Sequence, residues 1–385
     1  MIYMMIAGEA SGDMHAAQLM KAIRRYDAKA QFVFFGGDNM AEAAGREPVV
    51  HIREMAYMGF SEVVRNLGKI RHNLQLAKTL LRKVNPDCLI LVDYPSFNLK
   101  VADAAKSAGI KVFYYISPKV WAWKEWRVRT LKRVVDRMFV ILPFEKGWYR
   151  DAHQWDVTYV GNPTVAEIDD AMAAAPDFQD FVKAYGLRDK PILALLPGSR
   201  RGEIKNNLPV MLQASRRFVQ YQAVIAGAPG IDEDFYREYT ALPVIYDDRM
   251  ALLHNSRAAM VTSGTATLEC AIAGVPQVAC YRSNGRKVAY DIMKKVLSVP
   301  YVTLPNLIAG REVIPELLLH MCTPDAVGEA LSPLMSLTGA RRQAMLDDYA
   351  EVRKALGEED AADNAARHMV ADLENNRNLY SQSGQ

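Results

Sequence analysis

A carboxylate at the end of an apolar run is the first candidate for chemistry in this sequence. Asp93 follows residues 88–92, which are typical of a buried strand. In a parallel sheet, a side chain at that position lies beyond the carboxyl end of the strand, where ligands bind. Asp93 is therefore a candidate general base on a hydroxyl group. A cap on the following helix is an equally good interpretation, and Asn98 fits either a cap or a sugar contact.

A glycine-rich turn follows the first apolar run, at residues 8–13 (GEASGD). Two glycines permit a tight turn and a close approach of the backbone, and the next helix offers free N–H groups to a polar ligand. The spacing is not that of a dinucleotide-binding motif. Capping by Ser11 or Asp13 is the alternative. The candidate ligand contacts in the first half are Gly8, Glu9, Ser11, Gly12, Asp13 and Asn98.

Two turns in the second half have residues suited to a diphosphate and a ribose. Residues 195–203 combine backbone amides with the guanidinium of Arg200, which suits a diphosphate. In residues 263–269, Ser263 and Thr265 could meet phosphate, and Glu269 could accept both hydroxyls of a ribose. The alternatives are surface arginines and a solvated glutamate. The candidate contacts of a nucleotide-sugar donor are Gly198, Ser199, Arg200, Ser263, Gly264, Thr265 and Glu269. The loop 304–312 adds Asn306 and Arg311, which alone are compatible with an ordinary turn.

Residues 60–81 have apolar side chains at steps of three and four, which predicts a helix. The segment is basic, and no acidic residue occurs from 63 to 86. A basic amphipathic helix can lie on an anionic bilayer, although a crossover helix packed on a sheet has the same pattern. The candidate membrane contacts are Phe60, Val64, Arg65, Leu67, Lys69 and Arg71. Residues 124–137 are also basic, and the neighbouring Trp121, Trp123 and Trp126 fit an interface or the core.

The elements that must position these residues are strands alternating with helices. Strands are expected at 2–7, 32–35, 88–92, 111–116, 138–142 and 157–160, and again at 192–196, 223–226, 244–246, 258–262 and 277–281. This alternation predicts an α/β protein with two Rossmann-like, doubly wound parallel sheets facing a central cleft. We expect domains at residues 1–165 and 166–345, with helices of residues 346–385 returning to the first domain.

Bulk properties restrict the possible functions. The chain has 385 residues and a net charge of +3, too small to indicate nucleic acid as a partner. Cys88, Cys270, Cys280 and Cys322 are expected to be buried free thiols in a reducing cytoplasm, and no metal-type Cys/His spacing is present. The apolar start lacks a signal peptide's features, and no run is long enough to span a membrane. Any membrane contact is therefore expected to be peripheral.

Together these motifs resemble those of the lipid-A-disaccharide synthases, over nearly the whole chain. Besides the turns already described, the resemblance rests on residues 58–63 (MGFSEV), 117–123 (SPKVWAW), 142–145 (LPFE) and 304–312 (LPNLIAGRE). The Trp-Ala-Trp run and the Pro-Asn-Leu loop are its most specific parts. The sequence departs from the family pattern at Lys119 and at residues 161–163, which affects the finer acceptor contacts.

The resemblance implies a GT-B fold and an inverting transfer without metal or cofactor. Diacylglucosamine would pass from UDP-2,3-diacylglucosamine to the 6-hydroxyl of 2,3-diacylglucosamine 1-phosphate, at the inner face of the cytoplasmic membrane. Asp93 matches the family's proposed base, Arg200 and Asn306 match residues of its UDP-sugar site, and Glu269 matches its ribose contact. The first domain would bind the acceptor and the second the donor. The alternatives are another UDP-sugar enzyme, such as an epimerase or a peptidoglycan-type transferase, and a non-catalytic protein of the membrane surface.

Overall fold

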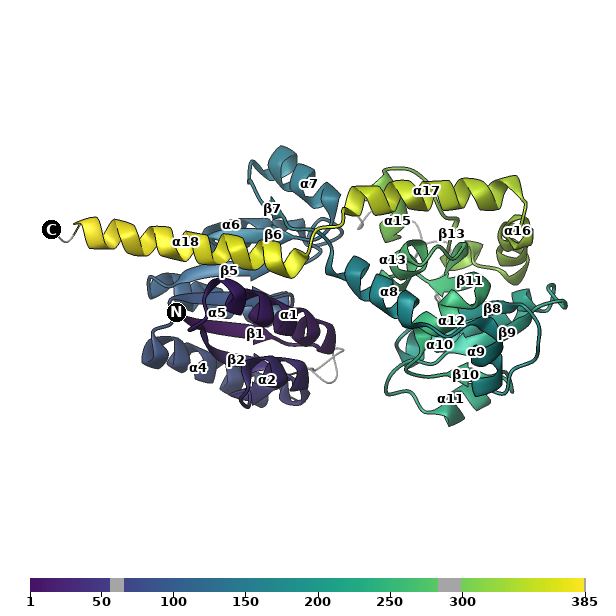
Figure 1. Ribbon diagram of the computed structural model, residues 1–385, viewed down its shortest axis with the longest axis horizontal. Helices are drawn as coiled ribbons and strands as arrows, with labels where there is room; N and C mark the ends of the chain where they lie inside the picture. Colours follow the sequence, from purple (N-terminus) through teal and green to yellow (C-terminus); the bar gives the residue numbers. More distant parts are fainter. Residues whose placement is uncertain (56–65, 283–298, 384–385) are drawn as a thin grey trace. The chain divides into compact units, whose positions relative to one another are not determined.

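The computed structural model describes residues 1–55, 66–282 and 299–383, with side chains described to residue 375. The chain forms two compact units (Figure 1). Residues 1–163 and 359–385 make the first unit, and residues 164–358 make the second. Each unit contains one parallel sheet, with seven described strands in the first and six in the second. The α/β class and the two doubly wound sheets are therefore as predicted.

The first sheet has the strand order β3-β2-β1-β4-β5-β6-β7. Its strands are β1 (Ile2–Ala7), β2 (Gln31–Gly36), β3 (Val50–His51), β4 (Cys88–Val92), β5 (Lys111–Tyr115), β6 (Arg137–Val140) and β7 (Thr158–Tyr159). The helical elements are α1 (Ala10–Tyr26), α2 (Asp38–Ala44), η1 (Ile52–Glu54), α4 (Leu67–Val84), α5 (Pro95–Ser107), η2 (Glu125–Arg127), α6 (Val128–Val134), α7 (Pro143–His153) and α18 (Ala361–Ser383). The two-residue β3 was not predicted.

Both faces of this sheet are covered. Along β1, Tyr3 and Met5 point to a core shared with α1, α2 and α18, whereas Met4 and Ile6 point to a core under α4, α5 and α6. Successive strand residues alternate between faces, so a strand that is covered on both sides is apolar throughout. In Figure 1, α18 runs beside α1.

The second sheet has the order β10-β9-β8-β11-β12-β13. Its strands are β8 (Ile192–Leu196), β9 (Gln222–Ala226), β10 (Val244–Ile245), β11 (Ser256–Thr262), β12 (Gln277–Tyr281) and β13 (Glu316–Leu318). The helical elements are α8 (Pro163–Ala174), α9 (Phe178–Ala184), α10 (Arg201–Ser215), α11 (Glu233–Arg237), α12 (Arg249–His254), α13 (Thr265–Ile272), α15 (Leu304–Ala309), η3 (Leu319–Met321), α16 (Pro324–Met335) and α17 (Ala340–Leu356). Strand β13 was not predicted in this mainly helical part of the sequence.

The expected return to the first domain at residue 346 differs from the structure. Helix α17 packs on α13, α15 and α16 of the second unit, and the chain rejoins the first unit only at Glu359. The buried side chains of α17 include Met345 and Tyr349, whose hydroxyl donates to the carbonyl oxygen of Val275. An amphipathic helix does not itself reveal which core it covers, so the sequence could not place this boundary.

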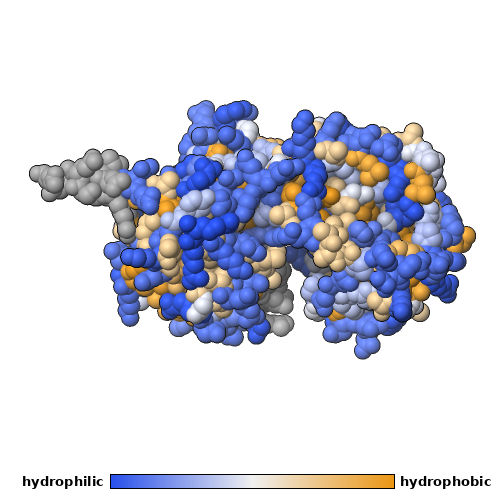
Figure 2. Space-filling model, viewed as in Figure 1, coloured by the Kyte–Doolittle hydropathy of each residue, from blue (hydrophilic) through white to orange (hydrophobic). Residues whose placement is uncertain are grey.

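Most of the surface visible in Figure 2 is hydrophilic in both units, with smaller apolar areas interspersed. The exposed large apolar residues include Leu67, Trp123 and Trp126 in the first unit and Val219 and Leu337 in the second. Within the described residues, no helix is both long and apolar enough to cross a membrane.

Candidate active site

Asp93 lies in a strained turn directly after β4. Asp93 and Tyr94 both have left-handed backbones, with φ angles of 43° and 47°. This conformation costs a non-glycine residue about 1–2 kcal/mol, and such strain is concentrated at functional sites. The carbonyl oxygen of Asp93 accepts hydrogen bonds from Asn98 Nδ2 at 2.7 Å and from the Tyr114 hydroxyl at 2.5 Å. Both hydrogen bonds hold the turn by the main-chain carbonyl of Asp93. They do not involve its side-chain carboxyl group.

The surroundings of Asp93 suit a base. Burial raises the pKa of the Asp93 carboxyl, and the charge of Lys119, the backbone N–H of Tyr94 and His15 oppose that rise. Lys119 is exposed in the loop after β5, and His15 is half-buried on α1. A carboxylate with a raised pKa accepts a proton more readily than an ordinary one. Charged groups on α1 and on the loop after β5 thus act on this carboxyl.

Asn98, predicted as a cap or a sugar contact, is a positioning residue in this structure. Its side chain is completely buried and its Nδ2 also approaches the carbonyl oxygen of Val92, at 3.3 Å. The amide therefore closes the β4–α5 turn around Asp93 and is not presented at the surface.

The glycine-rich turn at residues 8–13 has two different roles. A Cβ on Gly8 would lie 2.4 Å from the Tyr94 ring, so the close approach that this glycine permits is to Tyr94. Asp13 is 1% exposed, and its carboxylate accepts hydrogen bonds from the backbone N–H groups of Gly37, Asn39 and Met40. It caps α2 and not its own helix, which departs from both interpretations of the sequence. Of the other predicted residues, Gly12 is buried, Glu9 is half-buried and Ser11 is exposed.

A buried carboxyl holds the loop that carries Lys119. Glu145 is 1% exposed, and it accepts hydrogen bonds from Trp121 Nε1 at 2.9 Å and from the backbone N–H of Leu142 at 3.0 Å. Trp121 is buried and packs edge-to-face on Phe144. Trp121 therefore belongs to the core, whereas Trp123 and Trp126 are 51% and 67% exposed. Of the two alternatives, the core holds for Trp121, and an interface stays a prediction for Trp123 and Trp126.

Burial raises the pKa of Glu145 to about 7, against opposing hydrogen bonds from Leu142, Trp121 and Ile141 and the charge of Lys119. Because the folded protein keeps this proton to a higher pH than the unfolded chain, the free energy of unfolding should fall as pH rises from about 4.5 to about 7. The full shift corresponds to about 3 kcal/mol. We expect Glu145→Gln, which cannot ionise, to remove that slope in urea unfolding at pH 5 and pH 7.5.

The control is Glu42→Gln, which changes an exposed carboxyl on α2 and should leave the wild-type slope. An unchanged pH dependence in Glu145→Gln would show that Glu145 does not hold a proton in the folded protein at neutral pH.

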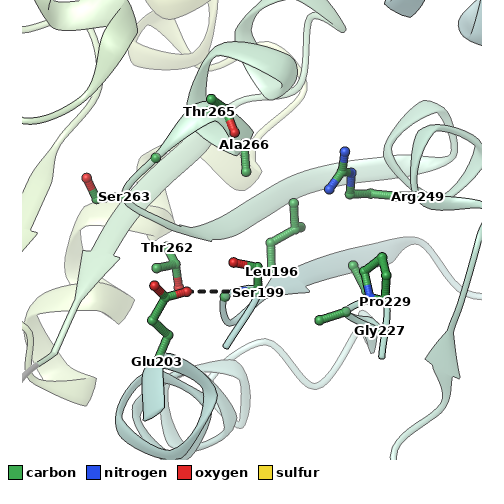
Figure 3. A pocket seen from close by; sticks show the side chains of 14 residues that line it. Leu196, Ser199, Glu203, Gly227, Pro229, Arg249, Thr262, Ser263, Thr265 and Ala266 are labelled. Carbon is green, nitrogen blue, oxygen red and sulfur yellow. Dashed lines mark hydrogen bonds between the residues drawn. The ribbon is translucent and has the colours of Figure 1, made fainter. Parts of the chain in front are cut away.

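A pocket of the second unit lies at the carboxyl ends of β8, β9 and β11 (Figure 3). It contains five of the seven residues predicted from the two turns: Gly198, Ser199, Ser263, Gly264 and Thr265. Helix α13 begins at this pocket after Gly264, whose φ of 149° suits glycine. Backbone N–H groups at the start of a helix favour an anion. The pocket therefore has the polar groups that a diphosphate requires.

One of the expected phosphate-binding amides is already occupied. Glu203 Oε2 accepts a hydrogen bond from the backbone N–H of Ser199 at 3.0 Å (Figure 3). A Cβ on Gly198 would lie 2.7 Å from the same oxygen, so the glycine is needed for this contact. The Arg200 side chain is 67% exposed, lies 3.7 Å from Glu203 and does not line the pocket. Ligand contacts at this turn would therefore require Glu203 or Arg200 to move.

Glu269 lies behind the pocket in an ion pair. Its Oε2 is 2.9 Å from Arg249 Nη2, and its side chain is 12% exposed. Burial raises the pKa of Glu269 and the Arg249 charge lowers it, while Glu167 on α8 raises it further. Arg249 itself lines the pocket. Arg249 was not predicted from the sequence, because it follows a short edge strand without any glycine turn.

Asn306 is buried, and all its hydrogen bonds are internal to the protein. Its Nδ2 donates to the Ile314 carbonyl oxygen and to Glu316 Oε1, both at 2.9 Å, and its Oδ1 accepts from the backbone N–H groups of Val313 and Ile314. The Glu316 carboxylate also accepts the N–H of Val302. The Val302 carbonyl oxygen in turn lies 3.4 Å from Ser263 Oγ. Asn306 thus supports the pocket from behind and does not line it.

Arg311 connects its loop to α17. Its guanidinium contacts Asp348 and Glu351, each at 2.5 Å. Like Asn306, Arg311 is absent from the pocket lining. The structure therefore gives the loop 304–312 a supporting role for both of its predicted residues.

The predicted membrane contacts are only partly described. Phe60, Val64 and Arg65 lie outside the described residues, whereas Leu67, Lys69 and Arg71 are exposed on α4. The rest of the apolar stripe, including Ile70 and Leu81, packs on the core of the first unit. From Ile70 onward this helix is therefore a crossover helix packed on the sheet.

All four cysteines are buried and free. Among the described residues, no group of three or more His, Cys, Asp or Glu side chains could hold a metal ion.

Two doubly wound units, with a pocket between glycine turns in the second, define a protein of the GT-B fold class. Solved structures agree on this fold. The UDP-GlcNAc 2-epimerase from Neisseria meningitidis aligns with a TM-score of 0.66 at 12% identity, covering 97% of this chain and 100% of that one. MurG from Acinetobacter baumannii aligns with a TM-score of 0.51 at 14% identity, covering 97% and 99%.

Sequence comparison identifies the family. Residues 2–370 match the family described as lipid-A-disaccharide synthetase, and this chain belongs to it. The lipid-A-disaccharide synthase of Myxococcus xanthus is 40% identical over 377 residues, which cover 95% of this chain and 96% of the relative. The enzyme of the same name from Syntrophus aciditrophicus is 36% identical over 376 residues, with the same coverage. The resemblance inferred from the motifs is confirmed.

Proposed function

We propose that this protein transfers 2,3-diacylglucosamine from UDP-2,3-diacylglucosamine to the 6-hydroxyl of 2,3-diacylglucosamine 1-phosphate. The products are the β-1′,6-linked disaccharide phosphate and UDP. Family membership supports the reaction. The observation that carries the mechanism is the buried Asp93 carboxyl, held in a strained turn at the end of β4. The first unit binds the acceptor and the second binds the donor.

In the proposed reaction Asp93 removes the proton from the acceptor's 6-hydroxyl. The oxygen attacks the anomeric carbon of the donor, and the bond from that carbon to the UDP oxygen breaks with its electron pair remaining on UDP. Attack from the face opposite the leaving group inverts the anomeric centre. Lys119, which carries positive charge near Asp93, is placed to attract the acceptor's phosphate.

The donor's charge develops on the UDP oxygens as the bond breaks. Helix α13 begins at the pocket, where Thr265 adds a hydroxyl donor, and the Ser263 hydroxyl, which donates to the Val302 carbonyl oxygen in this structure, would turn to the ligand. Preorganised donors of this kind stabilise a leaving group's developing charge. Glu269 is the proposed acceptor of the ribose hydroxyls. Arg200 is proposed to reach the diphosphate from its exposed position, Gly198 and Ser199 to line it, and Asn306 and Arg311 to support the pocket.

The acylated substrates are supplied from a lipid phase, and we propose that the protein lies peripherally on the anionic inner face of the cytoplasmic membrane. Leu67 begins α4, and Trp123 and Trp126 follow β5, so all three lie at the carboxyl end of the first sheet. Lys124 lies 3.8 Å from the ring centroid of Trp123, and Arg127 lies 5.5 Å from that of Trp126. Exposed tryptophans next to cations are typical of interfacial contacts.

Replacing Leu67, Trp123 and Trp126 together by serine should weaken binding to anionic vesicles roughly tenfold or more, because interfacial apolar area is lost. Flotation with vesicles containing an anionic phospholipid, at low and high salt, measures this. Val219→Ser combined with Leu337→Ser removes exposed apolar side chains from the second unit and serves as the control. Wild-type protein that binds no vesicles, or binds without salt sensitivity, would contradict the membrane assignment.

The release of UDP tests the proposed reaction. UDP should appear when the diacylated donor and the diacylated monosaccharide phosphate are both present, and not when either is omitted. Conversion of UDP-GlcNAc by itself, or transfer to a water-soluble acceptor without turnover of the lipid pair, would favour the epimerase or peptidoglycan-type alternative.

A further inference from the structure

Arg249 occupies an unusual position beside the pocket of the second unit. It begins α12, and its side chain is 47% exposed although its Nη2 lies 2.9 Å from the buried carboxylate of Glu269. The residues Gly227, Pro229 and Arg249 line this pocket and also a second hollow next to it, which extends to α8. Arg249 thus lines both the pocket and the neighbouring hollow.

The charges around the pocket give Arg249 a particular importance. Among the described residues that line the pocket, Arg249 is the one cation and Glu203 the one acid. Glu269 lies directly behind, and Glu167 adds a further negative charge near it. A diphosphate entering the pocket would therefore lie near the carboxylates of Glu203 and Glu269. Arg249 is the cation on the pocket wall that could neutralise the negative charge of the diphosphate.

Arg249 and Glu269 lie close together, but their atoms are not aligned for a hydrogen bond. Oε2 of Glu269 is buried and accepts no hydrogen bond of good geometry, although the guanidinium nitrogen is 2.9 Å away. A buried carboxylate oxygen without an aligned donor is costly. A ribose offers two hydroxyl donors to the same carboxylate, which would satisfy it better than the present ion pair does. The guanidinium would then be released.

We propose that Arg249 exchanges partners when a nucleoside diphosphate binds. The ribose hydroxyls replace the guanidinium on Glu269, and Arg249 turns to the diphosphate. This inference rests on the proposed donor site, but it adds a residue to it and couples recognition of the ribose to recognition of the phosphates. A nucleoside without phosphates breaks the Arg249–Glu269 ion pair and provides no new partner for the cation, so it binds much more weakly.

Calorimetric titration with UDP and with uridine distinguishes the contact with the diphosphate from the contact with the ribose, because uridine carries only the ribose. Arg249→Ala should weaken UDP binding roughly 10- to 100-fold, the usual loss for a hydrogen bond to a charged group. Uridine binding should stay the same or become tighter, because Glu269 no longer has a competing partner. Arg237→Ala removes an exposed arginine that pairs with Glu233 on α11, and it should change neither affinity.

Two further variants keep the test decisive. Arg249→Lys preserves the charge but not the planar fork, and should recover part of the UDP affinity. Glu269→Gln should weaken uridine and UDP by similar factors, since both carry the ribose. An equal loss of UDP and uridine in Arg249→Ala, or no loss of UDP, would overturn the exchange. Wild-type protein that binds no UDP would instead contradict the donor-site assignment itself.

Discussion

Asp93→Asn is expected to lower the rate of disaccharide formation by about 10²–10⁴-fold, the usual contribution of a positioned general base. Asparagine has the same shape, tolerates the left-handed backbone of this position and cannot accept the hydroxyl proton. Alanine at position 93 should be equally inactive but less stable, because it adopts this backbone less readily. Mass-spectrometric quantification of the product, with both substrates saturating, measures the effect.

Binding of UDP should be unchanged in Asp93→Asn, because the proposed donor contacts all belong to the second unit. Asp103→Ala is the matched control, since Asp103 is an exposed carboxylate on α5 that pairs with Arg133. Product formation at the wild-type rate in Asp93→Asn would exclude Asp93 as the base. A matching loss of UDP affinity would mean that the substitution had disturbed the fold.

Asn306→Ala is expected to destabilise the second unit by about 3–5 kcal/mol, because four hydrogen bonds of a fully buried amide are lost. The backbone N–H groups of Val313 and Ile314 would remain buried without their acceptor. For a unit of this size, the loss corresponds to a fall in Tm of roughly 10 °C. Differential scanning calorimetry of the intact protein measures it.

Asn306→Asp distinguishes the supporting role from a ligand contact. The aspartate would keep an acceptor for Val313 and Ile314 but would place a second carboxylate against Glu316, so it should be as destabilising as alanine. A variant at this position that keeps the wild-type Tm but loses UDP affinity would show that Asn306 contacts the ligand.

The fold was predictable because both sheets are buried on their two faces. Strands such as β1 and β4 are apolar throughout and are followed by turns, so their positions could be read closely from the sequence. Strands of two or three residues show no period, so β3 and β13 were missed, whereas the equally short β7 and β10 were found only from the apolar runs that contain them. The boundary at Glu359 depends on which core α17 covers, and that depends on tertiary packing.

Residue type and position after a strand were good guides to where the site lies, but not to what each side chain contacts. Gly198, Ser199, Ser263, Gly264 and Thr265 do come together in one pocket. The carboxylate of Asp13 and the amide of Asn306 instead make internal hydrogen bonds with segments distant in the sequence. Only the folded arrangement reveals such partners.

Arg249 and Glu203 line the pocket but were not predicted. Arg249 belongs to no recognisable motif, and Glu203 ends the 195–203 turn but was not selected from it. Both line the pocket, because the start of α12 and the first turn of α10 both lie beside it. Arginine and glutamate are common on surfaces, so the sequence alone offers no reason to select these two.

The anomeric configuration of the product shows whether the proposed transfer inverts the donor sugar. Purified protein with UDP-2,3-diacylglucosamine and 2,3-diacylglucosamine 1-phosphate should give one new disaccharide phosphate, and NMR of its anomeric proton should show a β linkage to the 6-position. An α linkage, a bond to another hydroxyl, or the absence of any disaccharide from these two substrates would contradict the proposed inverting transfer.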